Sequence, residues 1–263
     1  MEGRRHLLIP DAHACPGEDL RRFDWLGELI LQTMPDVIID IGDWFDMPSL
    51  CSYDKGTRSF EGRRYNDDIE SGHEAEMRAF GPIVKYNGTR SCQKKKQYHP
   101  EIYRIRGNHE HRIHKCSEKE PMLEGTIGMD DIAPRLTSLD FRVSPFLKPV
   151  MVDGVCYSHY FVSGIMGKPV PSARMLLAKH HVSCTAGHAH LRDWAEGVRA
   201  DGSRIQGLIC GSFHDPDHRS SYAPEQSQAI WWDGLHIKDH VKDGDYDRTE
   251  ISVRSLQRMM EGS

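Results

Sequence analysis

The chain has 263 residues and a formal net charge of -5 at pH 7, and 28% of its residues are Asp, Glu, Lys or Arg. This length suits one large α/β domain, and the acidic balance, with a pI near 6.3, argues against a protein that coats nucleic acid through bulk electrostatics. The apolar run before Pro10 is too short for a signal peptide or a membrane span, and seven cysteines without a C-x-x-C pair fit a reducing compartment, so we expect a cytoplasmic protein with no membrane partner.

The N-terminal part predicts a βαβ unit. Residues 6–10 predict a short strand, residues 18–32 place apolar side chains at helical spacing, and residues 37–41 form an apolar run that predicts a buried strand. Such a unit implies parallel strands joined by a right-handed crossover. Asp43 follows the second strand directly, at the sheet edge where open α/β sheets bind ligands.

Residues 47–100 are the least regular part of the sequence. A helix is expected from Asn66 to Phe80, with Asn66 as its N-cap and acidic residues in its first turn. After Pro82, residues 85–96 contain basic residues and no acidic residue. This segment is interpreted either as a solvated loop or as a basic rim that attracts an anionic substrate. The candidate substrate contacts in it are Lys94, Lys95 and Lys96.

The remainder predicts further short strands with few helices. A strand at 102–105 leads into Gly107-Asn108-His109-Glu110, and a hairpin at 150–157 turns at Asp153-Gly154. Further elements are a helix at 172–181 and strands at 182–186, 204–210 and 229–237. The charged tail beyond Lys242 is expected to be partly loose.

Several polar stretches that each follow a predicted strand carry metal-binding donors. If these strand ends converge, one cation can take Asp11, His13 and His190, and a second can take Asn108, His159 and His188. Asp43 can bridge both, because a carboxylate has two oxygens. Mixed carboxylate, amide and imidazole donors favour two divalent ions such as Mn, with Fe, Zn or Ni as alternatives. Two cations about 3.5–4 Å apart would generate a metal-activated hydroxide and neutralise a phosphoryl group, so the implied chemistry is hydrolysis at phosphorus.

The order of these motifs resembles the calcineurin-like metallophosphoesterase superfamily. The matching motifs are D-x-H at Asp11, G-D-x-x-D at Gly42, G-N-H-E at Gly107, a lone His159, and G-H-x-H at Gly187. The resemblance implies a four-layer α-β-β-α sandwich of two mixed sheets, and it implies the ligand sets given above. It also implies that His109 contacts the phosphate and helps to protonate the leaving oxygen, while Asp46 and Glu110 orient the ligands.

The spacing between the second and third motifs departs from the family pattern. Asp43 and Asn108 are 65 residues apart, about twice the usual distance, which predicts a cap-like insertion at about 47–100 within a single domain of residues 1–263. The look of the insertion is similar to that of bacteriophage-encoded members. Because it brings Lys and Arg, we expect phosphodiester hydrolysis on nucleotides or nucleic acid. Arg106 is a further candidate for contact with the substrate, and the oligomeric state stays open.

Other functions fit parts of the pattern. A phosphomonoesterase or protein phosphatase has the same metal shell. A sugar-nucleotide lipid pyrophosphatase, resembling the UDP-diacylglucosamine hydrolases, shares the form Gly-Asp-x-Phe-Asp but needs an apolar cap. A non-catalytic scaffold of this superfamily would have lost ligands, and every ligand position is filled here. Outside the motifs, His214 is interpreted as part of a solvated loop and Trp231 as strand packing.

Overall fold

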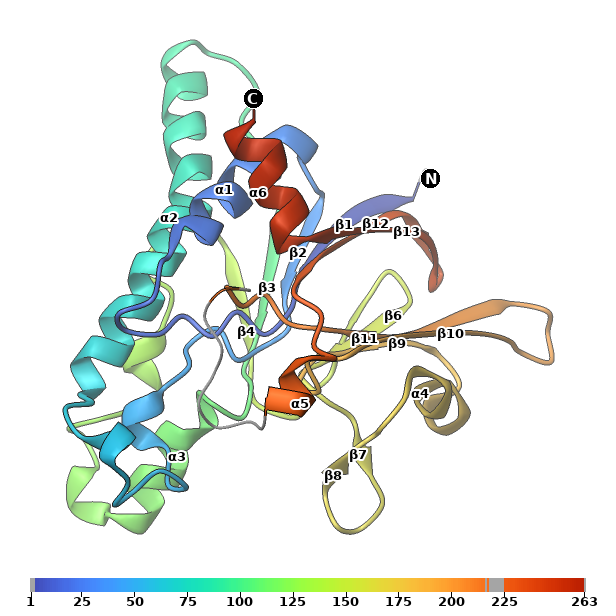
Figure 1. The fold of residues 1–263 in the computed structure, drawn as a ribbon. Coiled ribbons are helices and arrows are strands. Elements are labelled where there is room, and N and C mark those ends of the chain that lie inside the picture. Colours follow the sequence, from blue (N-terminus) through green and yellow to red (C-terminus); the bar gives the residue numbers. More distant parts are fainter. Residues whose placement is uncertain (1–2, 216, 218–224, 263) are drawn as a thin grey trace.

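Two large mixed sheets and the helices that cover them make up the fold (Figure 1). The computed structural model describes residues 3–215, 217 and 225–262. The first sheet has the order β13-β12-β1-β2-β3-β4, and the second has the order β10-β11-β9-β6-β5. A separate two-stranded sheet pairs β7 with β8.

The first sheet confirms the predicted βαβ unit. Its strands are β1 (Arg4–Ile9), β2 (Val37–Asp40), β3 (Glu101–Ile105), β4 (Phe141–Ser144), β12 (Gly234–Lys242) and β13 (Asp245–Ser252). Strands β1 to β4 are parallel, with Leu8 paired to Ile39 and Ile39 to Tyr103, while β12 and β13 are antiparallel to their neighbours. The carboxyl ends of β1, β2 and β3 therefore meet at one edge.

The second sheet contains three parallel strands, whose carboxyl ends lie at one edge. Its strands are β5 (Val150–Val152), β6 (Val155–Ser158), β9 (Ser183–Ala186), β10 (Arg192–Val198) and β11 (Arg204–Cys210), and the small sheet joins β7 (Val162–Ser163) and β8 (Lys168–Pro169). The predicted hairpin turn is confirmed: Asp153 and Gly154 have φ values of 48° and 83°, as a type I′ turn requires. Strands β6, β9 and β11 are parallel neighbours.

The helices differ from prediction in length and number. They are α1 (Arg21–Thr33), α2 (Tyr65–Cys92), α3 (His111–Lys119), α4 (Ala173–His180), α5 (Glu225–Gln228) and α6 (Val253–Glu261), with 3-10 turns at Pro48–Leu50, Arg58–Phe60, Pro121–Leu123 and Met129–Ile132. The predicted helix end near Phe80 is wrong, because α2 continues through Pro82. A Cβ on Gly27 of α1 would lie 2.8 Å from O of Arg78 and 2.9 Å from Cγ of Pro82, so close packing of α1 supports α2 there.

The prediction of a loose tail beyond Lys242 is also wrong. The turn at 243–244 leads into β13, which pairs with β12 over most of its length. Helix α6 then buries Val253 and Leu256, and the hydroxyl of Ser252 caps it by accepting a hydrogen bond from N of Ser255 at 3.2 Å. The charge of this segment suggested a loose tail, but pairing at the sheet edge and the apolar face of α6 order it.

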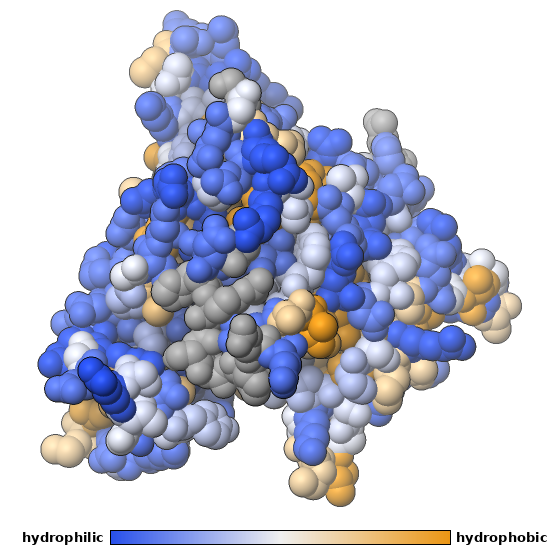
Figure 2. All heavy atoms as spheres, viewed as in Figure 1, coloured by the Kyte–Doolittle hydropathy of each residue, from blue (hydrophilic) through white to orange (hydrophobic). Residues whose placement is uncertain are grey.

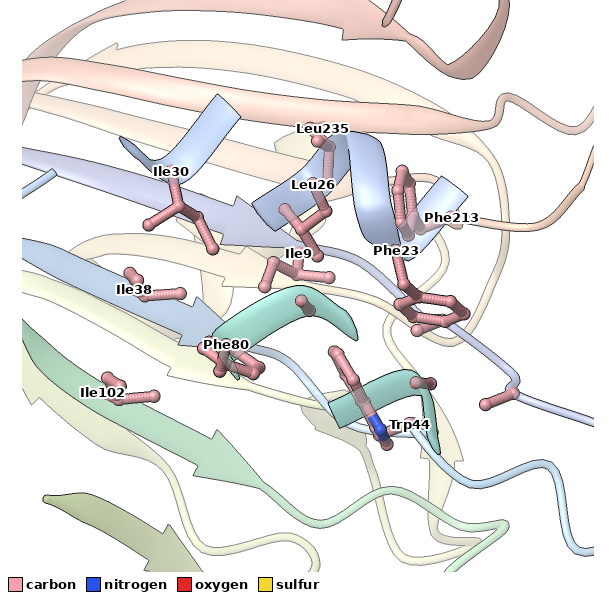
Figure 3. Close-up of a cluster of buried hydrophobic side chains, with 14 of the residues drawn as sticks. Ile9, Phe23, Leu26, Ile30, Ile38, Trp44, Phe80, Ile102, Phe213 and Leu235 are labelled. Carbon is pink, nitrogen blue, oxygen red and sulfur yellow. The ribbon is translucent and has the colours of Figure 1, made fainter. Parts of the chain in front are cut away.

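Three buried apolar clusters hold these elements together. The largest joins α1, α2 and α6 to the first sheet through residues that include Phe23, Leu26, Ile38, Phe80 and Ile102 (Figure 3). The second lies between the two sheets and includes Leu8, Ile39, Val155, Tyr157 and Leu208. The third packs α4 and nearby loops against the second sheet through Leu176, Cys184 and Ile209. Strands β1 and β2 are apolar on both faces because each face belongs to a different cluster.

Exposed apolar side chains are scattered over the described surface, and they include Tyr53, Met122, Ile165 and Met166. Hydrophilic residues predominate on the face in Figure 2, where hydrophobic residues form separate patches. Among the described residues, none of the helices is both long enough and apolar enough to span a membrane. All seven cysteines are within the described residues, and each is a free thiol.

The space between the sheets contains a buried lysine. Lys238 of β12 is fully buried, and its Nζ donates to Oγ1 of Thr185 at 2.6 Å. The same atom lies 4.3 Å from the centre of the Tyr246 ring and 4.6 Å from that of Tyr157. Burial lowers the pKa of Lys238 to about 7, because the ammonium loses its hydration.

Lys238 makes stability depend on pH. An unfolded lysine has a pKa of about 10.4, so between about pH 7 and pH 10 the unfolded chain binds a proton that the folded protein does not, and folding becomes more favourable as the pH rises. Relative to Lys238→Met, we expect the free energy of unfolding of the wild type to rise by up to about 4 kcal/mol across that window. Urea unfolding of both proteins at the two ends of the window measures it. Parallel pH profiles would contradict the lowered pKa of Lys238 in the folded protein.

Candidate metal centre

The donors predicted from the sequence converge at the shared edge of the two sheets. They come from the loops after β1, β2, β3, β6 and β9, and they are Asp11, His13, Asp43, Asn108, His159, His188 and His190. Of these, only Asn108 and His188 are partly exposed, and the others are buried. Side chains up to 179 positions apart in the sequence thus gather in one cluster.

The distances divide these donors into two groups that share Asp43. Donor atoms of Asp11, His13 and Asp43 lie within 4.8 Å of one another, and so do those of Asp43, His159 and His188. Oδ2 of Asp43 is 3.3 Å from Nε2 of His159 and 3.8 Å from Nε2 of His13. Asp43 therefore has the position that a bridging carboxylate needs.

The remaining donors lie around the same two groups. Nε2 of His190 is 3.3 Å from Oδ2 of Asp11. Oδ1 of Asn108 lies 2.8 Å from Nε2 of His159 and 2.7 Å from Nδ1 of His188. One amide oxygen thus connects both imidazoles of the second group.

The chemistry of the pocket fits bound cations. Three buried atoms, Oδ1 of Asp11, Nε2 of His13 and Nδ1 of His159, have no hydrogen-bond partner among the described residues, which is costly for a polar atom. Ligands about 2.1 Å from a divalent ion lie roughly 3.0–3.4 Å from one another. The carboxylate–imidazole distances of 3.3 to 3.9 Å approach that spacing and exceed ordinary hydrogen-bond lengths.

The carboxylates of the pocket are held in the charged form. Burial alone would raise the pKa of Asp43, but His159 and His109 lower it well below its ordinary value. Asp11 is likewise buried, and His159 and His190 lower its pKa. Burial acts to lower the pKa of His159, but the nearby charges of Asp43 and Asp11 raise it to about 9. Both aspartates are therefore anionic near neutral pH, as cation ligands must be.

Several of these residues have strained backbones. His13, Asp43, His188 and His190 have φ values of 45°, 55°, 69° and 55°, in the left-handed region that costs a non-glycine residue about 1–3 kcal/mol. Hydrogen bonds hold these turns: N of His13 donates to O of Asp43 at 2.8 Å, and N of His188 donates to Oδ2 of Asp11 at 2.6 Å. The fold bears this strain where the donors meet.

Glycines make the close approach of the loops possible. A Cβ on Gly107 would lie 2.0 Å from Oδ1 of Asp43, and one on Gly187 would lie 2.2 Å from Oδ1 of Asp11. Neither contact is sterically possible for a larger residue. The two glycines of the G-N-H-E and G-H-x-H motifs therefore leave room for the two carboxylates.

A second layer of carboxylates orients the donors. Glu110 accepts hydrogen bonds from N of Gly107 at 2.7 Å and from N of Asp43 at 3.1 Å, so it ties the loops after β2 and β3 together. Oδ1 of Asp46 accepts from Nδ1 of His13 at 2.7 Å, which leaves Nε2 of that ring facing Asp43. Both carboxylates thus fix the orientation of the donor loops through hydrogen bonds.

His109 lies beside the first group of donors. Its backbone N donates to Oδ1 of Asp43 at 2.8 Å, and its Nδ1 donates to O of Asp46 at 2.7 Å. Burial acts to lower the pKa of His109, but Asp43 and Asp46 raise it above its ordinary value. Arg112, which the sequence analysis did not single out, donates to Nε2 of His109 at 3.0 Å. Arg112 lies three positions after His109, and this i, i+3 spacing at the start of α3 could have predicted their contact.

A cleft of about 410 Å³ opens beside His13 and His109. Its wall includes residues from 48–64, so this half of the predicted insertion forms part of the cleft wall. The other half is α2, whose residues Ile69, Ala79 and Phe80 belong to the protein core. Six carboxylates and three arginines line the cleft: Glu18, Asp46, Asp54, Glu61, Asp67, Asp68, Arg63, Arg64 and Arg112. Its wall is therefore mainly acidic.

The proposed substrate contacts from the sequence lie elsewhere. Lys94, Lys95 and Lys96 are exposed just beyond the C-terminus of α2, a long helix in Figure 1. The cleft is lined by Asp67 and Asp68, which lie at the N-terminus of that helix. A helix of 28 residues is about 42 Å long, so the interpretation of these lysines as a rim of the site is wrong.

Arg106 is also unsuited to substrate contact. Its side chain is 4% exposed, and one guanidinium nitrogen donates to O of Ile132 at 2.8 Å. Arg106 therefore ties the loop after β3 to the segment before β4 and does not line the cleft.

Comparisons with known proteins add little to this geometry. No family model and no curated protein matches the chain. Among solved structures, the E. coli phosphoesterase Yfce is similar with a TM-score of 0.36 and 13% sequence identity, over 95% of this chain and 99% of that chain. At this TM-score the similarity establishes neither a shared fold nor a shared activity.

Proposed function

We propose that this protein is a phosphoesterase that depends on two divalent cations. The observation that carries the proposal is the placement of Asp43 in both groups of donors, which lets one carboxylate bridge two ions. The motif order that resembles the calcineurin-like superfamily supports it. The three apolar clusters also support the four-layer sandwich of that superfamily. They lie between helices and the first sheet, between the two sheets, and between the second sheet and α4.

The residues have separable roles in this proposal. Divalent cations at this position supply the charge that lowers the pKa of water and stabilises a phosphoryl group. Asp11, His13, Asp43 and His190 would hold the first, and Asp43, Asn108, His159 and His188 the second. Asp46 fixes the orientation of His13 through Nδ1.

His109 serves as the proton donor in this proposal. Nε2 of His109 accepts from Arg112 in the free protein, so in this proposal the substrate displaces that guanidinium. The imidazolium form, which the raised pKa of His109 favours, then gives its Nε2 proton to the departing oxygen. Arg112 adds a positive charge at the same side of the cleft, where it contacts Nε2 of His109.

The cleft favours a small phosphodiester, such as a nucleotide-sized one. Its volume of about 410 Å³ is in the range of small-molecule sites. A nucleic acid strand would meet a mainly acidic wall, and the lysines on which that expectation rested lie at the far end of α2. A phosphomonoester remains the alternative substrate. The polar wall argues against the acyl chains of a lipid pyrophosphatase, and the complete donor set argues against a scaffold.

A substrate panel on protein reconstituted with Mn²⁺ and, separately, with Zn²⁺ tests the proposed function. Bis-p-nitrophenyl phosphate, p-nitrophenyl phosphate, cyclic nucleotides and single-stranded DNA are compared, each with and without added chelator. We expect chelator-sensitive hydrolysis, with the small diesters turned over fastest. Absence of hydrolysis throughout would refute the proposal, while faster turnover of p-nitrophenyl phosphate would favour the monoesterase.

His109→Ala separates cation binding from proton transfer. We expect this variant to retain its cations and to lose about 10²- to 10⁴-fold in kcat, with the largest loss on substrates whose leaving groups have a high pKa. Initial rates across aryl phosphodiesters of graded leaving-group pKa, together with metal analysis of the purified protein, measure both effects. A loss that is equal for all leaving groups would assign His109 to a role other than proton donation.

A further inference from the structure

One more strand-end loop reaches the metal centre. Strand β11 ends at Cys210, and residues 211–214 then run beside the loop after β1, with N of Phe213 donating to O of Asp11 at 3.0 Å. This contact places His214, which is 9% exposed, against two predicted ligands. Its ring centre lies 4.5 Å from that of His13 and 4.9 Å from that of His190.

The three imidazoles present their nitrogens to a common point. One nitrogen from each of His13, His190 and His214 lies within 4.8 Å of the others. Because Asp46 takes Nδ1 of His13, the nitrogen available to the group is Nε2, which has no hydrogen-bond partner in the described part of the chain. His190 directs Nε2 towards Asp11 at 3.3 Å. The three rings therefore lie together beside Asp11, and two of them, His13 and His214, also line the cleft.

The surroundings of His214 hold its ring in place. His214 is buried, and its ring packs edge-on against the rings of both His13 and His190. The Trp231 ring packs edge-on against His190 at 4.5 Å and lies 5.7 Å from His214, and so forms a wall behind both imidazoles. A buried and packed imidazole is a suitable ligand, because little side-chain freedom is lost when it binds a cation.

We propose that His214 is an additional ligand of the first cation. That position then has three imidazoles, His13, His190 and His214, beside the carboxylates of Asp11 and Asp43, whereas the second has two imidazoles. Imidazole-rich sites favour Zn, Fe, Ni and their neighbours, while Mn prefers oxygen donors. The first position therefore binds its cation more tightly than the second and discriminates against Mn. This inference rests on the proposed two-cation site and adds a ligand and a metal preference to it.

The test uses Co²⁺ binding by the full-length, metal-free protein. Visible absorption is recorded during titration of the wild type, His214→Ala and His214→Gln, with Mn²⁺ added as a competitor. The matched control is His114→Ala, which removes an exposed histidine of α3 outside the centre. We expect the first equivalent of Co²⁺ to bind at least about 10-fold more weakly in both His214 variants, with an altered spectrum. The second equivalent and the control variant stay unchanged, and Mn²⁺ competes better in the variants.

The outcomes distinguish this inference from the proposed function. If the wild type binds two Co²⁺ and hydrolyses phosphoesters, but both His214 variants bind the first equivalent with the same affinity and spectrum, this inference is wrong and the function stands. A change confined to KM, with Co²⁺ binding unaltered, would likewise make His214 a substrate contact and overturn the inference. A wild type that takes up no Co²⁺ would refute the proposed function itself. If His214→Ala does not fold, His214→Gln, which keeps a side chain in the space, supplies the result.

Discussion

Asp43→Asn should lose nearly all phosphoesterase activity while the protein stays folded. Asparagine is among the few residues that tolerate the left-handed conformation of this position, where φ is 55°. Its amide oxygen can also keep the hydrogen bond from N of His109. What the variant lacks is the negative charge that both cation positions share. We expect kcat/KM to fall by about 10³-fold or more, equivalent to roughly 4 kcal/mol of transition-state stabilisation.

Metal analysis and thermal melting complete this experiment. The bound metal should fall from two ions per chain towards one or none, because the bridging position loses its charge, while the melting temperature of the metal-free protein changes little or rises. Near-normal turnover with two bound ions would show that Asp43 does not bridge. Asp36→Asn is the matched control, since Asp36 precedes β2 at the opposite edge of the sheet and lies outside the centre.

The placement of the donors was predictable because each follows an apolar strand. The runs before Asp11, Asp43 and Asn108 are parallel neighbours in one sheet, so their carboxyl ends had to meet. His214 lies four residues after β11, and the sequence pattern around it favoured a solvated loop. The sequence predicts a strand at 204–210, so the short distance from its end to His214 is the signal for this donor.

Elements whose order depends on tertiary contact were harder to predict. Strand β10 has no clean alternation of buried and exposed residues, and it pairs with β11 along its whole length. Helix α2 continues past Pro82 because α1 packs against it at Gly27, a contact that no local pattern announces. Helix α6 did carry signals, a serine N-cap and apolar residues three apart, but its many charges obscured them.

A buried ion triad connects the core to the metal centre. Arg104 of β3 donates to Oδ2 of Asp40 at 2.8 Å and to Oε2 of Glu76 at 2.6 Å, and all three side chains are essentially buried. Burial raises the pKa of Asp40 to about 6 even with this guanidinium beside it. Oδ1 of Asp40 also accepts a hydrogen bond from N of Gly42 at 3.1 Å, so the triad supports the turn that presents Asp43.

Arg104→Met should therefore destabilise the protein severely. The variant leaves two buried carboxylates without their cation, which typically costs about 3–5 kcal/mol, or a decrease in melting temperature of roughly 6–20 °C for a chain of this size. Arg142→Met is the control, because Arg142 on the neighbouring strand pairs with Glu101 at the surface and should cost less than about 1 kcal/mol. Urea unfolding of the three proteins gives the comparison.

The pH dependence of the variant identifies the cause of the loss. Without Arg104, the buried carboxyl of Asp40 takes up a proton in the folded state at a pKa further above its unfolded value. The folded variant then binds more protons than the unfolded chain, so its stability increases as the pH falls from about 8 to about 5.5. We expect the deficit against the wild type to shrink over that range. A deficit that is independent of pH, or one equal to that of Arg142→Met, would mean that lost packing around Trp44 and Phe141, and not the stranded charge, sets the cost.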